Sequence, residues 1–410
     1  MTDADSIGES DDASDGDAAT EPTGSVADRL ESRLAETLER RGAVAFVHVG
    51  FPRDPGLRYC QVVLEERSDQ SAAEREQPLT AVAFDGDTRE WFTATAADAS
   101  THPARALASQ LADRVAAGTV LTPARLPHDA ALYLEEAGFE PASTDVLERA
   151  RAAKTTAERE RIAAAQTAAG AGIRRGAALL ADATIEDGHL VADGDAVTPS
   201  RLRTAIDEGI VAAGAFPAGN TVVNPDSGHA PSSRDATVAA GSVGGADAAD
   251  EPLRPAEPIV LETAPRGPGG YHGGLVRTLV VDGDGGRERR AHVGATQSFR
   301  SAAAMLTADS ESVTAVEADL EAEVRAFGFE DPDAVATRVG GVGLEPRERP
   351  LAGGDEIEPG SVVRLESAVR VEGDRWLRIA DLLVKGDEGE RATYLASPSR
   401  SLEPRALLEE

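Results

Sequence analysis

The stretch Pro258–Thr278 reads PIVLETAPRGPGGYHGGLVRT, and it decides the fold of this chain. An apolar run from Ile259 ends in the carboxylate of Glu262, and a second apolar run begins at Leu275. The residues between the two runs are rich in glycine and proline, which favour turns. The pattern predicts two strands joined by a glycine-rich connection, with a carboxylate on the first strand.

The order of residues in this stretch resembles that of the pita-bread metallopeptidases, the family of Xaa-Pro aminopeptidases, prolidases and creatinase. A Gly-Tyr pair at 270–271 and an Arg-Thr pair at 277–278 match the family pattern. In that family, two Asp side chains from these strands bridge a pair of divalent metal ions. The resemblance places Glu262 at the first Asp position, with one extra residue before the tyrosine, and Gly274 at the second. Glycine has no side chain that can bind a metal.

Most of the other metal-ligand positions of the family also lack a donor side chain in this chain. The stretch 339–348, VGGVGLEPRE, resembles the glycine-rich stretch that carries the ligand His, and it places Gly340 at that His and Arg347 at a second, substrate-facing His. Glu366 keeps the family's first metal Glu, whereas Ala380 stands at the last one. The neighbouring Asp381 does not replace it, because successive strand residues point to opposite faces. The resemblance therefore leaves two of five ligand positions with a carboxylate.

This residue set predicts that no dinuclear metal centre forms and that the protein carries no cofactor. Two divalent ions about 3.5–4 Å apart need bridging carboxylates and outer ligands from several elements. A single weakly held divalent ion on the two glutamates is left open. Otherwise Glu262 and Glu366 are strand carboxylates in a polar cleft.

Composition points to a salt-adapted, cytoplasmic protein. The 410 residues include 72 acidic and 41 basic ones, for a formal charge of −31, and only Lys154 and Lys385 are lysines. Dense carboxylates repel one another at low ionic strength and are screened in concentrated salt. No clustered basic patch occurs, so we expect no binding to nucleic acid and no binding to a membrane. The single cysteine, Cys60, lies in an apolar context that is typical of a core residue.

The chain is long enough to predict two domains. Residues 1–25 are expected to be a disordered acidic tail, 26–147 a creatinase-like N-terminal α/β domain, 148–400 a pita-bread domain, and 401–410 a C-terminal tail. The fold class is α/β (α+β). Elements expected on the way include a helix over 28–41, a strand over 61–65 and a helix over 298–306. Thr155 and Glu158 form a capping box that opens a long helix.

Three functions compete. The first is a pseudo-peptidase that has lost its metal and binds a peptide, a small molecule or a partner, with a homodimer implied by the resemblance. The second is a metal-independent, creatinase-like C–N hydrolase, and the third is a metal-dependent aminopeptidase or dipeptidase with an atypical site. If the chain is active, the resemblance makes His229 and Glu366 catalytic. The expected binding residues are Glu262, Tyr271, His272, Arg277 and Arg347.

Overall fold

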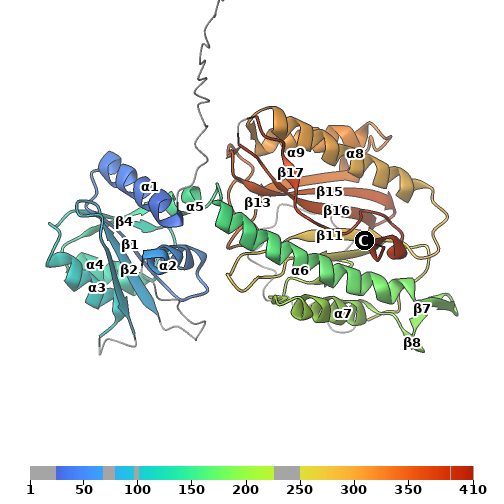
Figure 1. Ribbon diagram of the computed structural model, residues 1–410, viewed down its shortest axis with the longest axis horizontal. Helices are drawn as coiled ribbons and strands as arrows, with labels where there is room; N and C mark the ends of the chain where they lie inside the picture. Colours follow the sequence, from blue (N-terminus) through green and yellow to red (C-terminus); the bar gives the residue numbers. More distant parts are fainter. Residues whose placement is uncertain (1–24, 68–78, 97–100, 226–249, 388, 410) are drawn as a thin grey trace, which may run out of the picture.

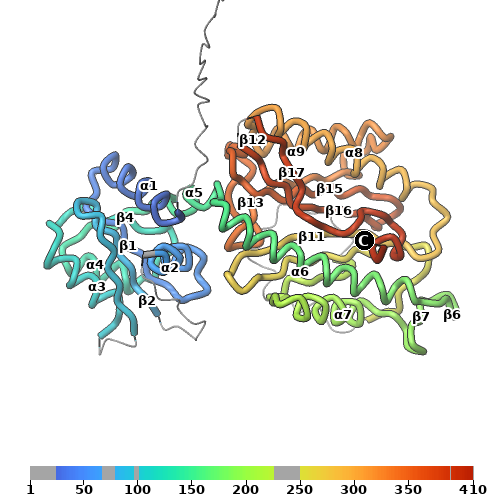
Figure 2. The backbone as a smooth tube through the Cα atoms, viewed as in Figure 1, coloured from blue at the N-terminus to red at the C-terminus, as the bar shows by residue number. Residues whose placement is uncertain are grey.

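The computed structural model describes residues 25–67, 79–96, 101–225, 250–387 and 389–409, and it forms two domains side by side (Figure 1). The N-terminal domain is drawn in blue to teal and the C-terminal domain in green to red. The short helix α5 (Val146–Ala150) lies where the chain passes from one domain to the other, as the backbone trace makes clear (Figure 2).

The N-terminal domain is built on a five-stranded sheet in the order β3-β2-β1-β4-β5. β1 pairs antiparallel with β2 and parallel with β4, so the sheet is mixed. Its strands are β1 Ala45–Gly50, β2 Thr80–Asp85, β3 Trp91–Thr95, β4 Thr119–Pro123 and β5 Glu140–Thr144. Its other helices are α1 Val26–Arg41, α2 Pro55–Arg67, α3 Pro103–Ala112 and α4 His128–Glu136.

The strand predicted over 61–65 is wrong, because these residues belong to helix α2. A short apolar run does not distinguish a strand from a buried helix by periodicity alone. The side chains of Leu57, Cys60 and Leu64 pack on one hydrophobic cluster at helical spacing. The start signal was Asp54, whose carboxylate accepts the Leu57 N–H at 2.7 Å, followed by Pro55 in the first turn.

The C-terminal domain contains a seven-stranded sheet in which β13, β15, β16, β11, β10 and β9 follow one another and β17 pairs with β16. Its strands are β9 Val222–Val223, β10 Ile259–Thr263, β11 Leu275–Leu279, β13 Val335–Gly341, β15 Val362–Glu372, β16 Arg375–Val384 and β17 Thr393–Tyr394. A small three-stranded sheet contains β6 Thr184–Glu186, β7 His189–Ala192 and β8 Asp195–Ala196. A two-stranded sheet pairs β12 Glu311–Ser312 with β14 Glu356–Ile357. Short 3-10 turns lie at η2 Pro332–Ala334 and η3 Pro404–Leu407.

Four helices cover one face of this sheet: α6 Thr156–Ala181, α7 Pro199–Ala212, α8 Arg287–Ala308 and α9 Val313–Arg325. Leu261 and Leu275 pack with α6 and α7, and Leu365 and Ile379 pack with α8 and α9. All four side chains are at odd-numbered positions. Because side chains alternate along a strand, even-numbered residues of these strands lie on the opposite face.

The capping box at the start of α6 is confirmed, with hydrogen bonds in both directions between Thr155 and Glu158. Helix α8 begins at Arg287, eleven residues before the predicted start at Ser298. Its first turn is the charged run Arg287–Arg290, which contains no apolar residue. The buried positions of the helix, which give the helical period, begin only at Ala291 and continue at Ala295.

The two domains share one hydrophobic cluster. It contains Leu30 and Tyr59 from the N-terminal domain and Ile162, Tyr271 and Val342 from the C-terminal domain. Cys60 lies in the same cluster and is a free, buried thiol, as predicted.

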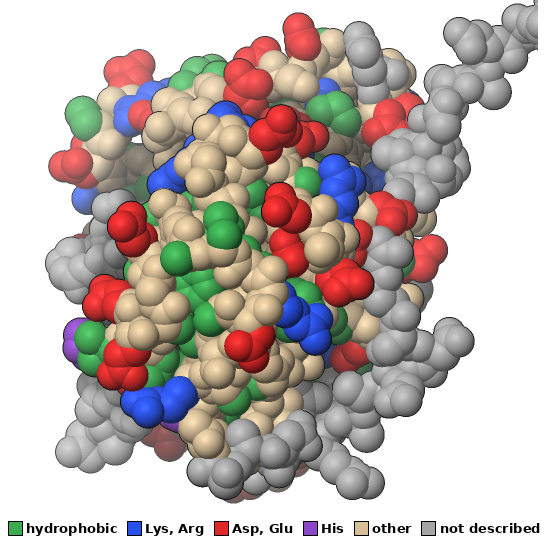
Figure 3. Space-filling model, turned by 90° about the vertical axis from the view of Figure 1, so that its left-hand side faces the viewer, with side chains coloured by type: hydrophobic (Ala, Val, Ile, Leu, Met, Phe, Trp, Pro, Cys, Tyr) green, Lys and Arg blue, Asp and Glu red, His purple; other side chains and the backbone are tan. Residues whose placement is uncertain are grey.

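Both lysines of the chain are buried, Lys154 at 2 % and Lys385 at 4 % exposure. The Lys154 ammonium pairs with Glu348 at 2.7 Å, and that of Lys385 donates to the carbonyl oxygens of Leu306 and Asp309. The exposed basic side chains are therefore arginines. On the outer face of the N-terminal domain, acidic side chains are spread over the whole view rather than gathered in one patch (Figure 3).

No helix among the described residues is long and apolar enough to span a membrane.

Candidate functional site

One row of aligned residues crosses the open face of the C-terminal sheet. Strand register places Glu262 on β10 opposite Val276 on β11, and Val276 opposite Ala380 on β16. Ala380 in turn lies opposite Glu366 on β15, and Glu366 opposite Arg338 on β13. The two carboxylates therefore flank a small apolar centre on the face opposite helices α6 to α9.

Arg364 and Arg378 bind both carboxylates at once. Arg364 Nη2 lies 2.7 Å from Glu262 Oε1 and 3.0 Å from Glu366 Oε2. Arg378 Nη1 lies 2.9 Å from Glu262 Oε2, and its Nε and Nη2 donate to Glu366 Oε1. All four carboxylate oxygens thus accept hydrogen bonds from guanidinium groups. We call Glu262, Glu366, Arg364 and Arg378 the Arg/Glu tetrad.

The charges in the Arg/Glu tetrad hold one another ionised. Burial alone would raise the pKa of Glu366, but the guanidinium groups of Arg378 and Arg364 outweigh it and lower the pKa to about 2. The pKa of Glu262 is lowered for the same reason. Burial opposes the charge of Arg378 as well, and the two carboxylates raise its pKa above the ordinary value. Two positive and two negative charges make the tetrad neutral overall.

The residues present do not fit a dinuclear metal centre. Such a centre needs carboxylate oxygens free to bridge two cations, together with outer ligands. Here each carboxylate is engaged by two fixed positive groups, which repel an incoming cation. Gly274 and Gly340 add no donor atoms. Within the described ranges, no group of three or more His, Cys, Asp or Glu side chains is placed to hold a metal ion.

A cavity of about 260 Å³ opens over the tetrad. Three of its lining side chains are arginines and two are the tetrad glutamates, while the remaining walls are glycine, asparagine and small apolar residues. The lining residues are Gly219, Asn220, Val222, Glu262, Ala264, Arg338, Gly340, Pro346, Arg347, Arg364 and Glu366.

Arginine side chains lie against Gly274 and Gly340, the two glycines that the resemblance aligned with metal-ligand positions. A Cβ placed on Gly274 would lie 3.5 Å from Arg364 Cδ. A Cβ placed on Gly340 would lie 3.5 Å from Arg347 Nε and 3.6 Å from its Cγ. The space beside each glycine is thus bordered by an arginine side chain.

Three of the predicted site residues, Glu262, Glu366 and Arg347, line this one cavity. Tyr271 does not, because its side chain is buried in the interdomain cluster and its hydroxyl donates to Glu158 Oε1 at 3.0 Å. Arg277 is fully buried, with Nη2 2.8 Å from Asp381 Oδ1. Both side chains are therefore engaged in buried contacts away from this cavity, and contact of Tyr271 or Arg277 with a ligand stays a prediction.

His272 is also absent from the cavity wall. Its side chain is 6 % exposed, and Nδ1 lies 3.2 Å from the Ala264 carbonyl oxygen. Burial lowers the pKa of this imidazole. The predicted catalytic residue His229 lies outside the described residues. Asp381 points away from the tetrad and pairs with Arg277 and Arg400, as strand alternation predicted.

Sequence reasoning missed Arg338, Arg364 and Arg378 as site residues. The available signal was alternation, because Arg364 and Glu366 are two apart on one strand and so share a face. Arg378 and Ala380 stand in the same relation on β16.

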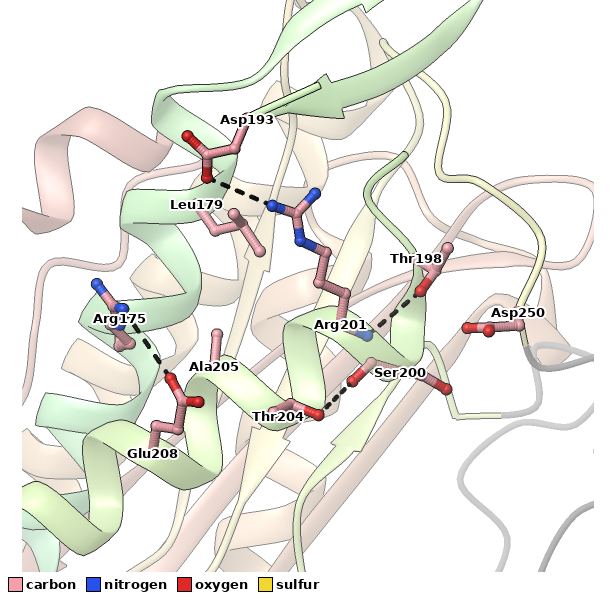
Figure 4. A pocket seen from close by; sticks show the side chains of 10 residues that line it. All are labelled: Arg175, Leu179, Asp193, Thr198, Ser200, Arg201, Thr204, Ala205, Glu208 and Asp250. Carbon is pink, nitrogen blue, oxygen red and sulfur yellow. Dashed lines mark hydrogen bonds and ion pairs between the residues drawn. The ribbon is translucent and has the colours of Figure 1, made fainter. Parts of the chain in front are cut away.

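A second hollow, of about 490 Å³, lies where α6 and the β7–β8 turn meet the start of α7 (Figure 4). Its polar side chains mainly serve local structure. The Thr198 hydroxyl caps α7 by accepting the Arg201 N–H at 3.3 Å, and the Arg201 guanidinium lies 3.4 Å from Asp193. Arg175 and Glu208 approach to 3.9 Å across the helices.

Comparisons with known proteins agree with this architecture. Residues 160–385 match the model of metallopeptidase family M24. A prolidase from Pyrococcus horikoshii is similar in structure over 91 % of this chain and 99 % of its own, with a TM-score of 0.66 and 15 % identity. Dipeptidase PepE from Mycobacterium ulcerans aligns over 92 % and 97 %, with a TM-score of 0.64 and 20 % identity.

A further similar structure is the N-terminal domain of FACT complex subunit SPT16 from chickpea (Cicer arietinum). It aligns over 92 % of this chain and 97 % of its own, with a TM-score of 0.62 and 14 % identity. No curated protein matches the sequence. At these identities the structural likenesses establish the fold, and the predicted fold class, an N-terminal α/β domain followed by a pita-bread domain, is confirmed.

Proposed function

Because the chain belongs to metallopeptidase family M24, we propose that it is a pseudo-peptidase of that family, which binds a small ligand in the cavity over the Arg/Glu tetrad and does not hydrolyse it. The observation that carries this proposal is the occupation of all four carboxylate oxygens of Glu262 and Glu366 by guanidinium groups. Carboxylates held in this way are poor metal ligands and poor bases. The cavity above them remains available to a ligand.

The metal-independent hydrolase has less support. A general base works best with a pKa near the operating pH, whereas the pKa of Glu366 is lowered to about 2 by Arg378 and Arg364 against the effect of burial. Its proposed partner His229 lies outside the described residues. The atypical aminopeptidase has less support still, since its chemistry needs the ligands that Gly274, Gly340 and Ala380 lack.

The first prediction concerns metal content. Purified protein dialysed in concentrated salt should carry no stoichiometric manganese, cobalt or zinc, because the tetrad presents two fixed cations where a metal pair would need free carboxylates. Elemental analysis measures this directly. One or two tightly held ions per chain would contradict the pseudo-peptidase proposal.

Activity measurements separate the remaining alternatives. Xaa-Pro dipeptides and N-substituted amino acids should not be turned over in high salt, with or without added manganese. If turnover occurs and resists chelators, His229→Ala and Glu366→Gln should each abolish it, and the hydrolase reading would replace ours. Turnover that depends on manganese would instead favour the aminopeptidase.

We extend the proposal to a cytoplasmic homodimer that binds a peptide or small molecule and neither nucleic acid nor membrane. The family resemblance supports the dimer, and the acidic composition argues against binding to nucleic acid or an anionic membrane. Sedimentation at several protein concentrations in high salt measures the assembly.

A further inference from the structure

The cavity over the tetrad contains one cation whose charge is not matched. Arg347 has no hydrogen-bond or salt-bridge partner within the part of the chain that the structure describes. Its side chain is partly buried and lies along Gly340 at the cavity wall. An arginine that is partly removed from water gains from an anionic partner, and its planar fork suits a carboxylate in particular.

Neighbouring charges also affect how well an anion would stabilise the charged form of Arg347. Burial is the main factor that lowers the pKa of Arg347, and the nearby Arg338 and Arg364 add to it. Glu317 and Glu366 act in the opposite direction from beyond salt-bridge distance. The charged form of Arg347 would thus be favoured by an anion bound in the cavity.

The Arg/Glu tetrad limits what else the ligand carries. A free amino group would need a carboxylate to receive it, and Glu262 and Glu366 are the carboxylates that line the cavity. Both are already neutralised by Arg364 and Arg378. A ligand with an ammonium group would therefore lose its water without gaining a counter-charge, which is costly in a partly buried site.

The remaining walls define the size and polarity of the ligand. Val222, Ala264 and Pro346 offer small apolar contacts, and Asn220 adds an amide whose nitrogen already donates to the Ala264 carbonyl oxygen at 3.0 Å. The volume of about 260 Å³ lies below the range of about 300–1,000 Å³ that is usual for drug-sized ligands. The cavity suits a molecule of the size of an amino-acid derivative.

Resting on the proposed binding function, we propose that the cavity takes a small carboxylate that has no free amine, such as an N-acylated amino acid, with its carboxylate on Arg347 and its uncharged part against Val222, Ala264 and Pro346. Such a ligand carries a carboxylate and no ammonium group, whereas a free dipeptide carries both, and its ammonium group would find no unpaired carboxylate in this cavity. The ligand is recognised at its acid end by Arg347, the arginine of the cavity wall that has no partner among the described residues.

The test is isothermal titration of the full chain in high salt with matched probes. N-acetyl-L-proline should bind. Its amide, which lacks the carboxylate, should bind at least about ten-fold more weakly, since a charged hydrogen bond contributes about 1.5–3 kcal/mol. Glycyl-proline, which has a free amine, should also bind at least about ten-fold more weakly, because its ammonium group would lose water without gaining a counter-charge. Arg347→Gln should weaken N-acetyl-L-proline by about 10- to 100-fold, and Arg347→Lys should restore part of the loss. Arg300→Gln, at an exposed arginine on α8, is the matched control and should bind as the native protein does.

The outcomes separate this inference from the proposed function. Binding of glycyl-proline or of the amide as tightly as N-acetyl-L-proline would overturn the carboxylate assignment while leaving a metal-free binding protein in place. Inorganic phosphate that binds more tightly than N-acetyl-L-proline, or no binding of any probe, would overturn it too. Hydrolysis of a probe or a stoichiometric metal would instead overturn the proposed function. A melting temperature measured for each variant shows that a loss of affinity does not come from unfolding.

Discussion

Among individual residues, Glu366 is a buried carboxylate whose charge is matched by two arginines. Its carboxylate is 2 % exposed and lies between Arg364 and Arg378. A buried charge pair adds little stability over an apolar replacement, but removal of one partner leaves the other charge buried and unmatched. Glu366 therefore matters to stability mainly through the two arginine charges that it matches.

This arrangement predicts how stability depends on pH. Glu366 has a folded-state pKa of about 2, below the ordinary value of 4.5, so its contribution is complete above about pH 4.5 and is lost as the pH falls toward 2. Glu366→Gln should lower the free energy of unfolding by about 3–5 kcal/mol near neutral pH. The difference between the native protein and this variant should shrink between pH 4.5 and 2.

Denaturant titrations at several pH values in constant high salt measure this difference. Glu372→Gln, at an exposed position on the same strand, is the control and should change stability little at any pH. A native-to-variant difference that stays constant down to pH 2 would show that Glu366 is not held ionised by its arginines.

Among the secondary-structure elements, helices α6 and α7 approach each other at glycines. A Cβ on Gly172 would lie 2.7 Å from Ile210 Cγ1 and 2.9 Å from the Ile206 carbonyl oxygen. These distances are shorter than any ordinary contact. The two helices therefore depend on the absence of a side chain at this position to reach the sheet together.

Gly172→Ala should lower the free energy of unfolding by about 1–3 kcal/mol through overpacking, although alanine favours a helix by about 1 kcal/mol over glycine. Chemical denaturation measures the change. Gly267→Ala is the matched control, because the nearest atom to its Cβ would be 3.5 Å away and its effect should be small. A Gly172→Ala variant more stable than the native protein would show that the helices have room to separate.

The sequence predicted those elements that carry local signals. The Thr155–Glu158 capping box depends on residues a few positions apart, and it is confirmed. Helix α2 was mistaken for a strand because a five-residue apolar run has no clear period. The two tetrad carboxylates were predicted to share a cleft, and they do.

The tetrad arginines were not predicted, and the reason is physical. Arg378 reaches Glu262 across strands β16 and β10, which are more than a hundred residues apart in sequence. Such a contact depends on the register of several strands, which no local pattern reveals. The sequence shows that Gly274, Gly340 and Ala380 have no donor side chains, whereas the pairing of Arg364 and Arg378 with the two glutamates becomes visible only in the fold.

At the scale of the whole molecule, two features dominate: a hydrophobic cluster shared between the domains and a formal charge of −31. The shared cluster joins side chains from α1 and α2 to side chains near α6 and the 270–271 turn. Separation of the domains would expose apolar surface on both sides. We therefore expect the two domains to unfold together.

The charge predicts that stability falls as salt is removed. Screening extends over only about 3 Å at 1 M salt but about 30 Å at 0.01 M, where the surface carboxylates repel one another across the whole molecule. The melting temperature should drop as sodium chloride is lowered from molar to tens of millimolar. A series in which sucrose replaces the salt serves as the control for general solvent effects. A melting temperature that does not change would contradict the view that surface repulsion limits stability.

The burial of both lysines has a chemical consequence. Lys154 and Lys385 hold their ammonium groups on buried carboxylate and carbonyl oxygens, out of reach of solvent. Reagents that acylate primary amines, such as succinimidyl esters, therefore find no lysine to modify while the C-terminal domain is folded. Each lysine can react only after local or global unfolding exposes its amine to solvent. The rate of covalent labelling at these two positions would therefore measure how often the C-terminal domain opens.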